Sequence, residues 1–283
     1  MATITAQDLI RLALLAAQSE AATLGVAEQA LMVSAVQMDA IERLTPAQRG
    51  QVLARALMAP YPLGFFAAMR GCAGLKRLLP ELDALFGVPH GADGPEPLDV
   101  GEHQLRALAQ AARRNAPLAV RLAALLHKIG MGRTPPAVWP SHPGHGARGM
   151  ILLAALARRI ALPADALDLT LLAVAECDRV HRACDLRAGA IAALLERVEA
   201  EARPERFEQL LAVCCCDYAA YPGHAEAVYQ RAPSLRRALA AYLAVREPAQ
   251  PDALLEARAR AIAQAGIGAG VGTGTGAENA DRR

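Results

Sequence analysis

The segment LAALLHKIGMGRTPPAVWPSHPGHGARG, residues 122–149, decides how the fold of this chain is interpreted. It begins as the end of an apolar helix and changes at Gly130 into a loop that holds four prolines and five glycines. A loop of this length inside a helical pattern is usually functional or disordered. The same loop carries Trp139, the only tryptophan of the sequence, together with His142 and His145.

The sequence on both sides of this loop is typical of helices. Hydrophobic residues make up 54% of the chain and aromatic residues only 4%, and the abundant Ala and Leu favour helix over strand. Thr45-Pro46 predicts a helix start, with Thr45 as the N-cap and Pro46 in the first turn. Because no run of residues indicates a strand, the predicted fold class is all-α. Helices are expected over residues 5–20, 27–41, 48–57, 65–71, 75–85, 103–114, 117–129, 150–160, 164–178, 188–201, 206–216, 225–231, 234–245 and 252–265.

Length and composition exclude several classes of protein. A length of 283 residues suffices for one large domain or two ordinary ones, and the apolar fraction excludes a disordered chain. No run approaches the roughly 18 apolar residues of a membrane-spanning helix, and the first residues lack the pattern of a secretory signal. Three of the six cysteines are consecutive. That is a poor disulfide framework, and it predicts a reducing, cytoplasmic location.

Charge is unevenly distributed along the chain. The net charge is +2, but residues 101–150 hold seven basic side chains and one acidic side chain. An excess of this size could steer a polyanion such as RNA toward the protein. The alternative is a solvated helix face whose partners lie elsewhere in the fold. The candidate RNA-binding residues of this block are Arg106, Arg113, Arg114, Arg121, Arg133 and Arg148.

Histidines gather in the same part of the sequence. Five of the seven fall between His103 and His181. Asp178 and His181 are three residues apart and therefore share one face of a helix. Imidazoles and a carboxylate that converge from separate helices suit a divalent transition metal, which would activate water for phosphate hydrolysis. The alternative is that these histidines are ordinary capping or loop residues.

The segment 122–149 resembles the HD-domain signature of bacterial tRNA nucleotidyltransferases, the CCA-adding enzymes, in their enterobacterial-type branch. LTPAQRGQVLARAL (44–57) and DVGEHQL (99–105) resemble the neck, body and HD entry of that family, and LPADALDLTLLAVAECDRVH (162–181) resembles its C-terminal helices. The resemblance covers roughly residues 8–265. The sequence also contains a Gly/Pro-rich stretch before residue 100 and a Gly-rich tail at its end. Together with these two stretches, the resemblance predicts neck and body helices (1–88), a linker (89–100), an HD-type domain (101–218), tail helices (219–265) and a disordered tail (266–283).

The chain departs from this family at the sites of nucleotide addition. The resemblance begins at the family's neck, and the sequence contains no Asp-x-Asp motif to hold two metal ions. We therefore expect this chain not to add nucleotides and to have no nucleotide-addition substrate. The base-reading element of the family's neck falls on Ile4, Thr5 and Asp8, where an acid replaces the family's Arg.

The HD-type site departs from the family as well. His103, His127 and Asp178 match family residues, but Lys128 replaces an Asp and Cys177 replaces a His. The remaining positions have the family's residue types; they are His142, His145, His181 and Asp217. A protonated lysine has no lone pair for a metal. We therefore expect Lys128 to stand where the metal would bind and to pair with Asp178, as buried charges need partners.

Three functions are compatible with these residues. The interpretation that we favour is a non-catalytic relative that binds tRNA, another RNA or a protein partner and needs no cofactor. The second is an altered HD phosphohydrolase for 2′-phosphates or 2′,3′-cyclic phosphates, with Mn, Ni, Mg or Zn held by His103, His127 and Asp178; Cys177 as a ligand would favour zinc. The third is an oligomeric scaffold or regulatory subunit, such as a homodimer.

Overall fold

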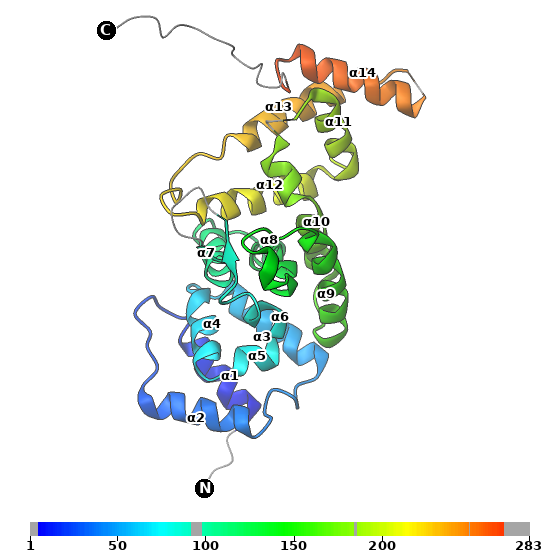
Figure 1. Cartoon of the computed structure of the whole chain (residues 1–283). Helices are drawn as coiled ribbons and strands as arrows, with labels where there is room; N and C mark the ends of the chain where they lie inside the picture. The colour runs from blue at the N-terminus through cyan, green and yellow to red at the C-terminus, as the bar shows by residue number, and fades with distance from the viewer. Residues whose placement is uncertain (1–4, 92–97, 184–185, 249, 269–283) are drawn as a thin grey trace, which may run out of the picture. The chain divides into compact units, whose positions relative to one another are not determined.

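The computed structural model describes residues 5–91, 98–183, 186–248 and 250–268, which are predominantly helical (Figure 1). The strands within these ranges are β1 (Pro89–His90) and β2 (Leu98–Asp99), which pair antiparallel. The predicted all-α class is therefore confirmed. None of the helices in these ranges combines the length and apolar character that crossing a membrane would require.

The chain forms two compact units, and each is described by itself. They are Met1–Cys177 with Glu208–Tyr229, and Asp178–Phe207 with Gln230–Arg283. The region boundaries expected from the family resemblance stay predictions. In the predicted linker 89–100, residues 92–97 lie outside the described ranges, as do residues 269–283 of the predicted disordered tail.

The first unit contains most of the helices. Its elements are α1 (Ala6–Leu15), α2 (Val26–Gln37), α3 (Pro46–Met58), α4 (Pro62–Gly71), α5 (Gly74–Leu78), α6 (Pro80–Asp83), β1, β2, α7 (Val100–Arg113), α8 (Leu118–Leu126), the 3-10 turns η1 (Ile129–Arg133) and η2 (Pro136–Val138), α9 (His145–Arg159), and parts of α10 (Ala164–His181) and α12 (Pro204–Ala219). α3 starts as predicted. Thr45 Oγ1 accepts from the Gln48 amide, and Gln48 Oε1 accepts from the Thr45 amide at 2.9 Å.

α8 lies in the core of this unit and packs along α7. Its side chains from Ala119 to Leu126 are all buried. The chain continues from α8 into η1, and the start of α9 packs against that turn. A Cβ atom on Gly130 would lie 1.9 Å from the carbonyl oxygen of His145, so this close approach requires glycine. The loop predicted over 130–149 is therefore partly ordered as η1, η2 and the first turn of α9.

Two of the predicted helices differ from the structure. The helix expected over 75–85 is divided into α5 and α6, because Pro80 has no N–H to donate to the preceding turn and begins a new helix. The helix expected over 225–231 was wrong, since residues 225–230 are not helical and α13 begins at Arg231. Tyr229 in that segment is buried against Tyr218, with 5.3 Å between the ring centroids. This tertiary contact outweighs the local preference for helix.

The second unit consists of α11 (Ala188–Arg197), α13 (Arg231–Leu243), α14 (Pro251–Gln264) and the remaining parts of α10 and α12. α14 packs against both α11 and α13. Its Arg258 lies over the ring of Tyr242 and donates to Glu201 Oε2 at 2.8 Å. Arg258 thus joins α14 to α13 and to the segment after α11.

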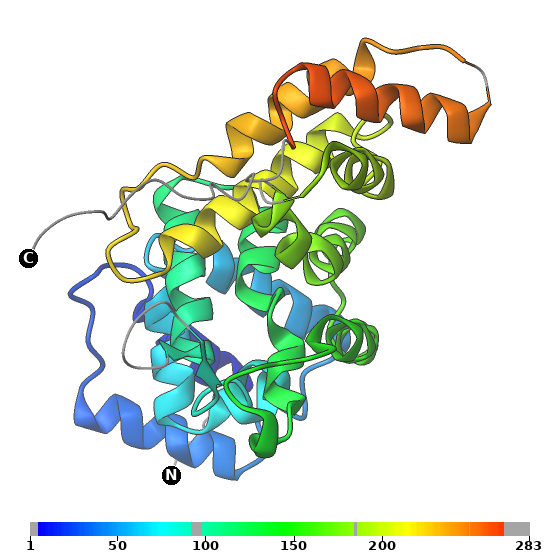
Figure 2. The same cartoon turned by 45° about the horizontal axis from the view of Figure 1, so that its top comes forward.

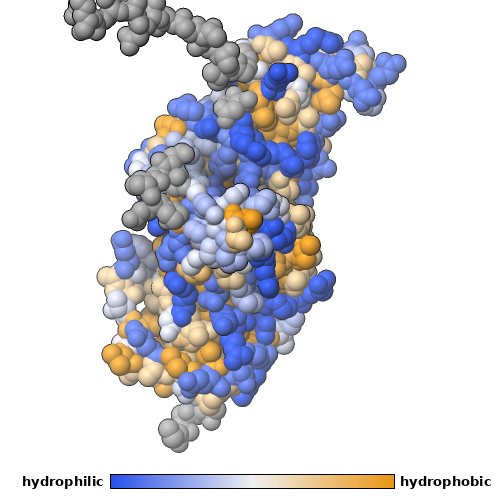
Figure 3. All heavy atoms as spheres, viewed as in Figure 1, coloured by the Kyte–Doolittle hydropathy of each residue, from blue (hydrophilic) through white to orange (hydrophobic). Residues whose placement is uncertain are grey.

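Apolar side chains remain on the surface of α2. Val26 is 85% exposed and Leu31 is 49% exposed, while Met32 and Val36 of the same helix are buried. Apolar surface is visible in the lower part of Figure 3, where α1 and α2 lie in Figure 1.

Candidate functional site

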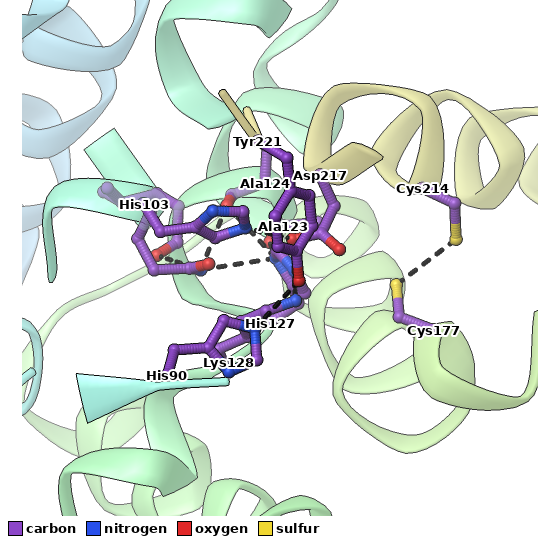
Figure 4. A network of polar contacts seen from close by, with 12 residues as sticks. His90, His103, Ala123, Ala124, His127, Lys128, Cys177, Cys214, Asp217 and Tyr221 are labelled. Atoms are coloured by element: carbon purple, nitrogen blue, oxygen red, sulfur yellow. Dashed lines mark hydrogen bonds and ion pairs between the residues drawn. The ribbon is translucent and has the colours of Figure 1, made fainter. Parts of the chain in front are cut away.

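Four polar side chains from three helices meet around one carboxylate oxygen in the core of the first unit (Figure 4). α12 carries Asp217, α7 carries His103, and the end of α8 carries His127 followed by Lys128. Asp217 Oδ1 lies 2.7 Å from His103 Nε2, 2.9 Å from His127 Nε2 and 2.7 Å from Lys128 Nζ. Lys128 Nζ also lies 3.2 Å from His127 Nε2.

The four side chains are almost completely buried. His103 is 0% exposed, Asp217 is 1% exposed, and His127 and Lys128 are each 3% exposed. Burial alone would raise the pKa of Asp217, but the Lys128 ammonium and the hydrogen bond from His103 outweigh it and hold this pKa well below its usual range. The site therefore contains a buried carboxylate that the ammonium of Lys128 neutralises.

Both imidazoles of the centre are held neutral. Burial lowers the pKa of His103 and of His127, and the positive charge of Lys128 lowers both further. We assign the His103 proton to Nε2, which then donates to Asp217. His127 Nε2 lies 2.9 Å from Asp217 Oδ1, and its Nδ1 lies 3.1 Å from the Ala124 carbonyl and 3.3 Å from Gln104 Nε2.

Two aromatic residues of this neighbourhood were missed by the sequence analysis. His90, at the end of β1, has its Nε2 atom 2.8 Å from the hydroxyl of Tyr221, and the Tyr221 ring lies 4.6 Å from that of His103. Burial and then the charge of Lys128 lower the pKa of His90 to about 3. His90 and Tyr221 are 131 residues apart. Their residue types were the only signal that the sequence offered.

The histidines of the proline-rich loop hold that loop in place. His142 Nε2 donates to the Pro89 carbonyl at 2.9 Å, and its Nδ1 pairs with Thr134 Oγ1 at 2.9 Å. His145 Nδ1 donates to the His142 carbonyl at 3.0 Å. Both histidines thus hold the loop in place, and His142 also joins it to β1.

Cys177 lies beside another cysteine. It is 3% exposed, and its sulfur is 3.5 Å from that of Cys214 on α12 (Figure 4). Asp178 and His181 belong to the second unit. The expected pairing of Lys128 with Asp178 therefore stays a prediction. The partner that the structure gives Lys128 within the first unit is Asp217.

The six arginines singled out in the sequence fall into two groups. Arg121 is 5% exposed and donates to the carbonyls of Leu57 and Ala116 at 2.8 and 2.9 Å. Arg148 donates to the Pro143 carbonyl at 2.8 Å and to Thr134 Oγ1 at 2.7 Å. These two guanidinium groups stabilise the fold. The exposed members are Arg106, Arg113, Arg114 and Arg133.

The arrangement around Asp217 does not fit a divalent metal ion. The ammonium of Lys128 has no lone pair and lies among the atoms that would be ligands, so it would repel a second cation. In the part of the chain that the structure describes, no group of three or more His, Cys, Asp and Glu side chains is arranged to hold a metal ion. What the arrangement can do is neutralise a buried carboxylate and join three helices.

Comparison with known proteins identifies relatives. No protein-family model matches the chain. The chain is 42% identical over 212 residues to the multifunctional CCA protein of Nitrosospira multiformis, and the aligned residues make up 75% of this chain and 51% of that relative. The identity is 40% over 233 residues for that of Dechloromonas aromatica (82% and 57%) and 43% over 199 residues for that of Verminephrobacter eiseniae (70% and 48%). The chain thus spans about half the length of the curated relatives that it matches.

Proposed function

This chain belongs to the CCA-adding enzyme family and spans about half the length of its matched relatives, and from this premise we propose that it binds tRNA without catalysing a reaction. Two features support the proposal. The ammonium of Lys128 neutralises the buried carboxylate, which supports the absence of catalysis, and a group of exposed arginines supports tRNA binding. A tRNA ligand also implies that the protein acts in the cytoplasm.

The observation that carries the non-catalytic part is the position of Lys128 Nζ. It lies 2.7 Å from Asp217 Oδ1 and 3.2 Å from His127 Nε2, in the centre of the buried cluster. A metal that activates water needs lone pairs from its ligands and an open position for the water. Here the carboxylate of Asp217 accepts from a lysine, which supplies charge and a hydrogen bond but is not a Lewis acid.

The charge of the exposed arginines supports the tRNA-binding part. Arg106 and Arg133 are exposed and belong to the block in which basic side chains outnumber acidic ones by seven to one. Phosphates contribute most of the affinity of such contacts, and the affinity then falls with the logarithm of the salt concentration. Lys128 belongs to the same block but is buried, so only part of the positive charge of this block lies on the surface.

Titration of labelled tRNA over a range of salt concentrations tests this proposal. We expect the slope of log Kd against log salt to fall by about one unit for each phosphate contact removed by Arg106→Glu or Arg133→Glu. Arg158→Glu, at another exposed arginine in α9, is the matched control and should leave the slope unchanged. Equal affinity for tRNA and an unrelated polyanion, or no dependence on salt, would refute tRNA binding.

A turnover assay tests the non-catalytic part. The protein is incubated with a 2′-phosphorylated nucleotide and with a 2′,3′-cyclic nucleotide in the presence of manganese, nickel, magnesium or zinc. We expect no release of phosphate and no ring opening above the rate without protein. Metal-dependent turnover that is lost in His127→Ala would mean that the site is a hydrolase in spite of Lys128.

A further inference from the structure

Aromatic side chains gather in a short segment that the centre around Asp217 uses only in part. Three of the five tyrosines of the sequence lie between residues 218 and 229, together with His224. This segment comprises the C-terminal end of α12 and the turns after it, which include positions where a helix was expected. It lies beside α7 in both Figure 1 and Figure 2, in agreement with the contact between Tyr221 and His103.

The rings of this segment form a small stack. The centroids of Tyr218 and His224 are 4.5 Å apart with an angle of 22° between the ring planes. Tyr229 lies 5.3 Å from Tyr218 and is buried, so it fixes the stack to the unit. Tyr218, Tyr221 and His224 are each half-buried and therefore keep part of their surface in contact with solvent.

Arginines of α7 border the same segment. Arg113 donates to Glu226 Oε1 at 2.5 Å, and both Arg113 and Arg114 lower the pKa of Glu226. Arg106 is seven residues before Arg113 and so lies on the same face of α7. Positive charge is thus placed along the aromatic segment. In the described part of the chain, the ion pair found among these three arginines is that of Arg113 with Glu226.

We propose that the surface formed by Tyr218, Tyr221 and His224 with Arg106, Arg113 and Arg114 binds an unpaired nucleotide of an RNA. The base stacks on the rings, and the flanking phosphates lie against the arginines. Half-exposed rings beside cations are the combination that single-stranded nucleic acids use. A duplex hides its base faces except at its ends, so the arginines alone would contact a helical stem. This inference rests on the proposed RNA binding and names the part of the RNA that is recognised.

The experiment compares an RNA hairpin with a blunt end and the same hairpin with a short unpaired 3′ overhang that contains 2-aminopurine. We expect the overhang to raise the affinity of the unmodified protein about tenfold and to quench the 2-aminopurine fluorescence by stacking. Tyr218→Leu removes the ring and should abolish both effects. Tyr218→Phe is the matched control, since it keeps the ring, and it should preserve both. The blunt hairpin should bind all three proteins equally.

The outcomes separate this inference from the proposal on which it rests. If the blunt hairpin binds but the overhang adds neither affinity nor quenching, the nucleotide site is refuted and RNA binding stands. The same holds if Tyr218→Phe loses as much as Tyr218→Leu. If neither RNA binds the unmodified protein, both statements fail. Thermal melting checks that each variant is folded, and His224→Ser provides the same comparison at a half-buried loop position if Tyr218→Leu does not fold.

Discussion

Replacement of Lys128 by methionine removes the only ammonium from the buried centre and keeps an apolar stem of similar length. Asp217, which is 1% exposed, then remains as a buried carboxylate without its cation. Loss of one partner from a buried ion pair costs about 3–5 kcal/mol. We therefore expect Lys128→Met to lower the free energy of unfolding at neutral pH by that amount, as measured by urea denaturation followed by circular dichroism.

A double-mutant cycle separates the ion pair from packing. Asp217→Asn alone leaves the ammonium buried without its anion, so it should also destabilise the protein. The double variant has neither charge, and we expect it to be more stable than the sum of the two single losses predicts, by about 2 kcal/mol or more. Additive losses would mean that Lys128 and Asp217 do not interact, whatever the distance between their atoms.

The pH dependence of the Lys128→Met variant has a definite sign. In the unmodified protein the pKa of Asp217 is depressed, so its stabilising contribution is present above the unfolded pKa of about 3.9 and is lost as the pH falls. Without Lys128, burial dominates and raises the pKa of Asp217. Protonation of Asp217 at low pH then removes the unpaired charge and restores part of the stability of the variant. The deficit should be largest at neutral pH and smaller in acid. A loss below about 1 kcal/mol at pH 7.5, or one that does not change with pH, would refute the reasoning.

Two further predictions concern the same centre. Lys128→Asp places a second carboxylate beside Asp217 and the two imidazoles, and manganese or zinc should then stabilise the variant by about 2.7 kcal/mol at 100 times its Kd; equal stabilisation of the unmodified protein in thermal melting would contradict this. His90, whose pKa is lowered to about 3, remains neutral in the folded chain while the unfolded chain takes up a proton below pH 6.5. Stability should therefore fall with the pH, by about 2 kcal/mol from this residue at pH 5. Urea denaturation of His90→Gln should show a correspondingly smaller change between pH 7.5 and 5, and an identical change would count against it.

Local sequence signals predicted most of the helices. Thr45 and Pro46 act through their own backbone neighbours, so the start of α3 follows from residues that are adjacent in sequence. Pro80 acts locally as well, and its division of the helix expected over 75–85 could have been predicted. The error at residues 225–231 is different in kind. The burial of Tyr229 against Tyr218 depends on a contact that helix propensity does not describe.

The residues of the site were named from the sequence, but their pairing was not. Because Lys128 replaces an acid of the resembling family, a buried lysine near the metal position could be expected from sequence. Its contact with Asp217, 89 residues away, comes only from the tertiary structure, which brings the end of α8 to Asp217 on α12. His90 and Tyr221 were missed because no sequence signal near either residue indicates a contact with the other.

The sequence by itself determined the all-α class and the start of α3, since each depends on side-chain chemistry or on neighbours along the chain, and the family resemblance implied the change from acid to lysine at position 128. The tertiary structure decided which carboxylate neutralises Lys128, which arginines remain on the surface and how the rings at the end of α12 and in the turns after it stack. These properties depend on distances between segments far apart in the sequence. Packing of the buried helices fixes those distances, and composition and spacing do not.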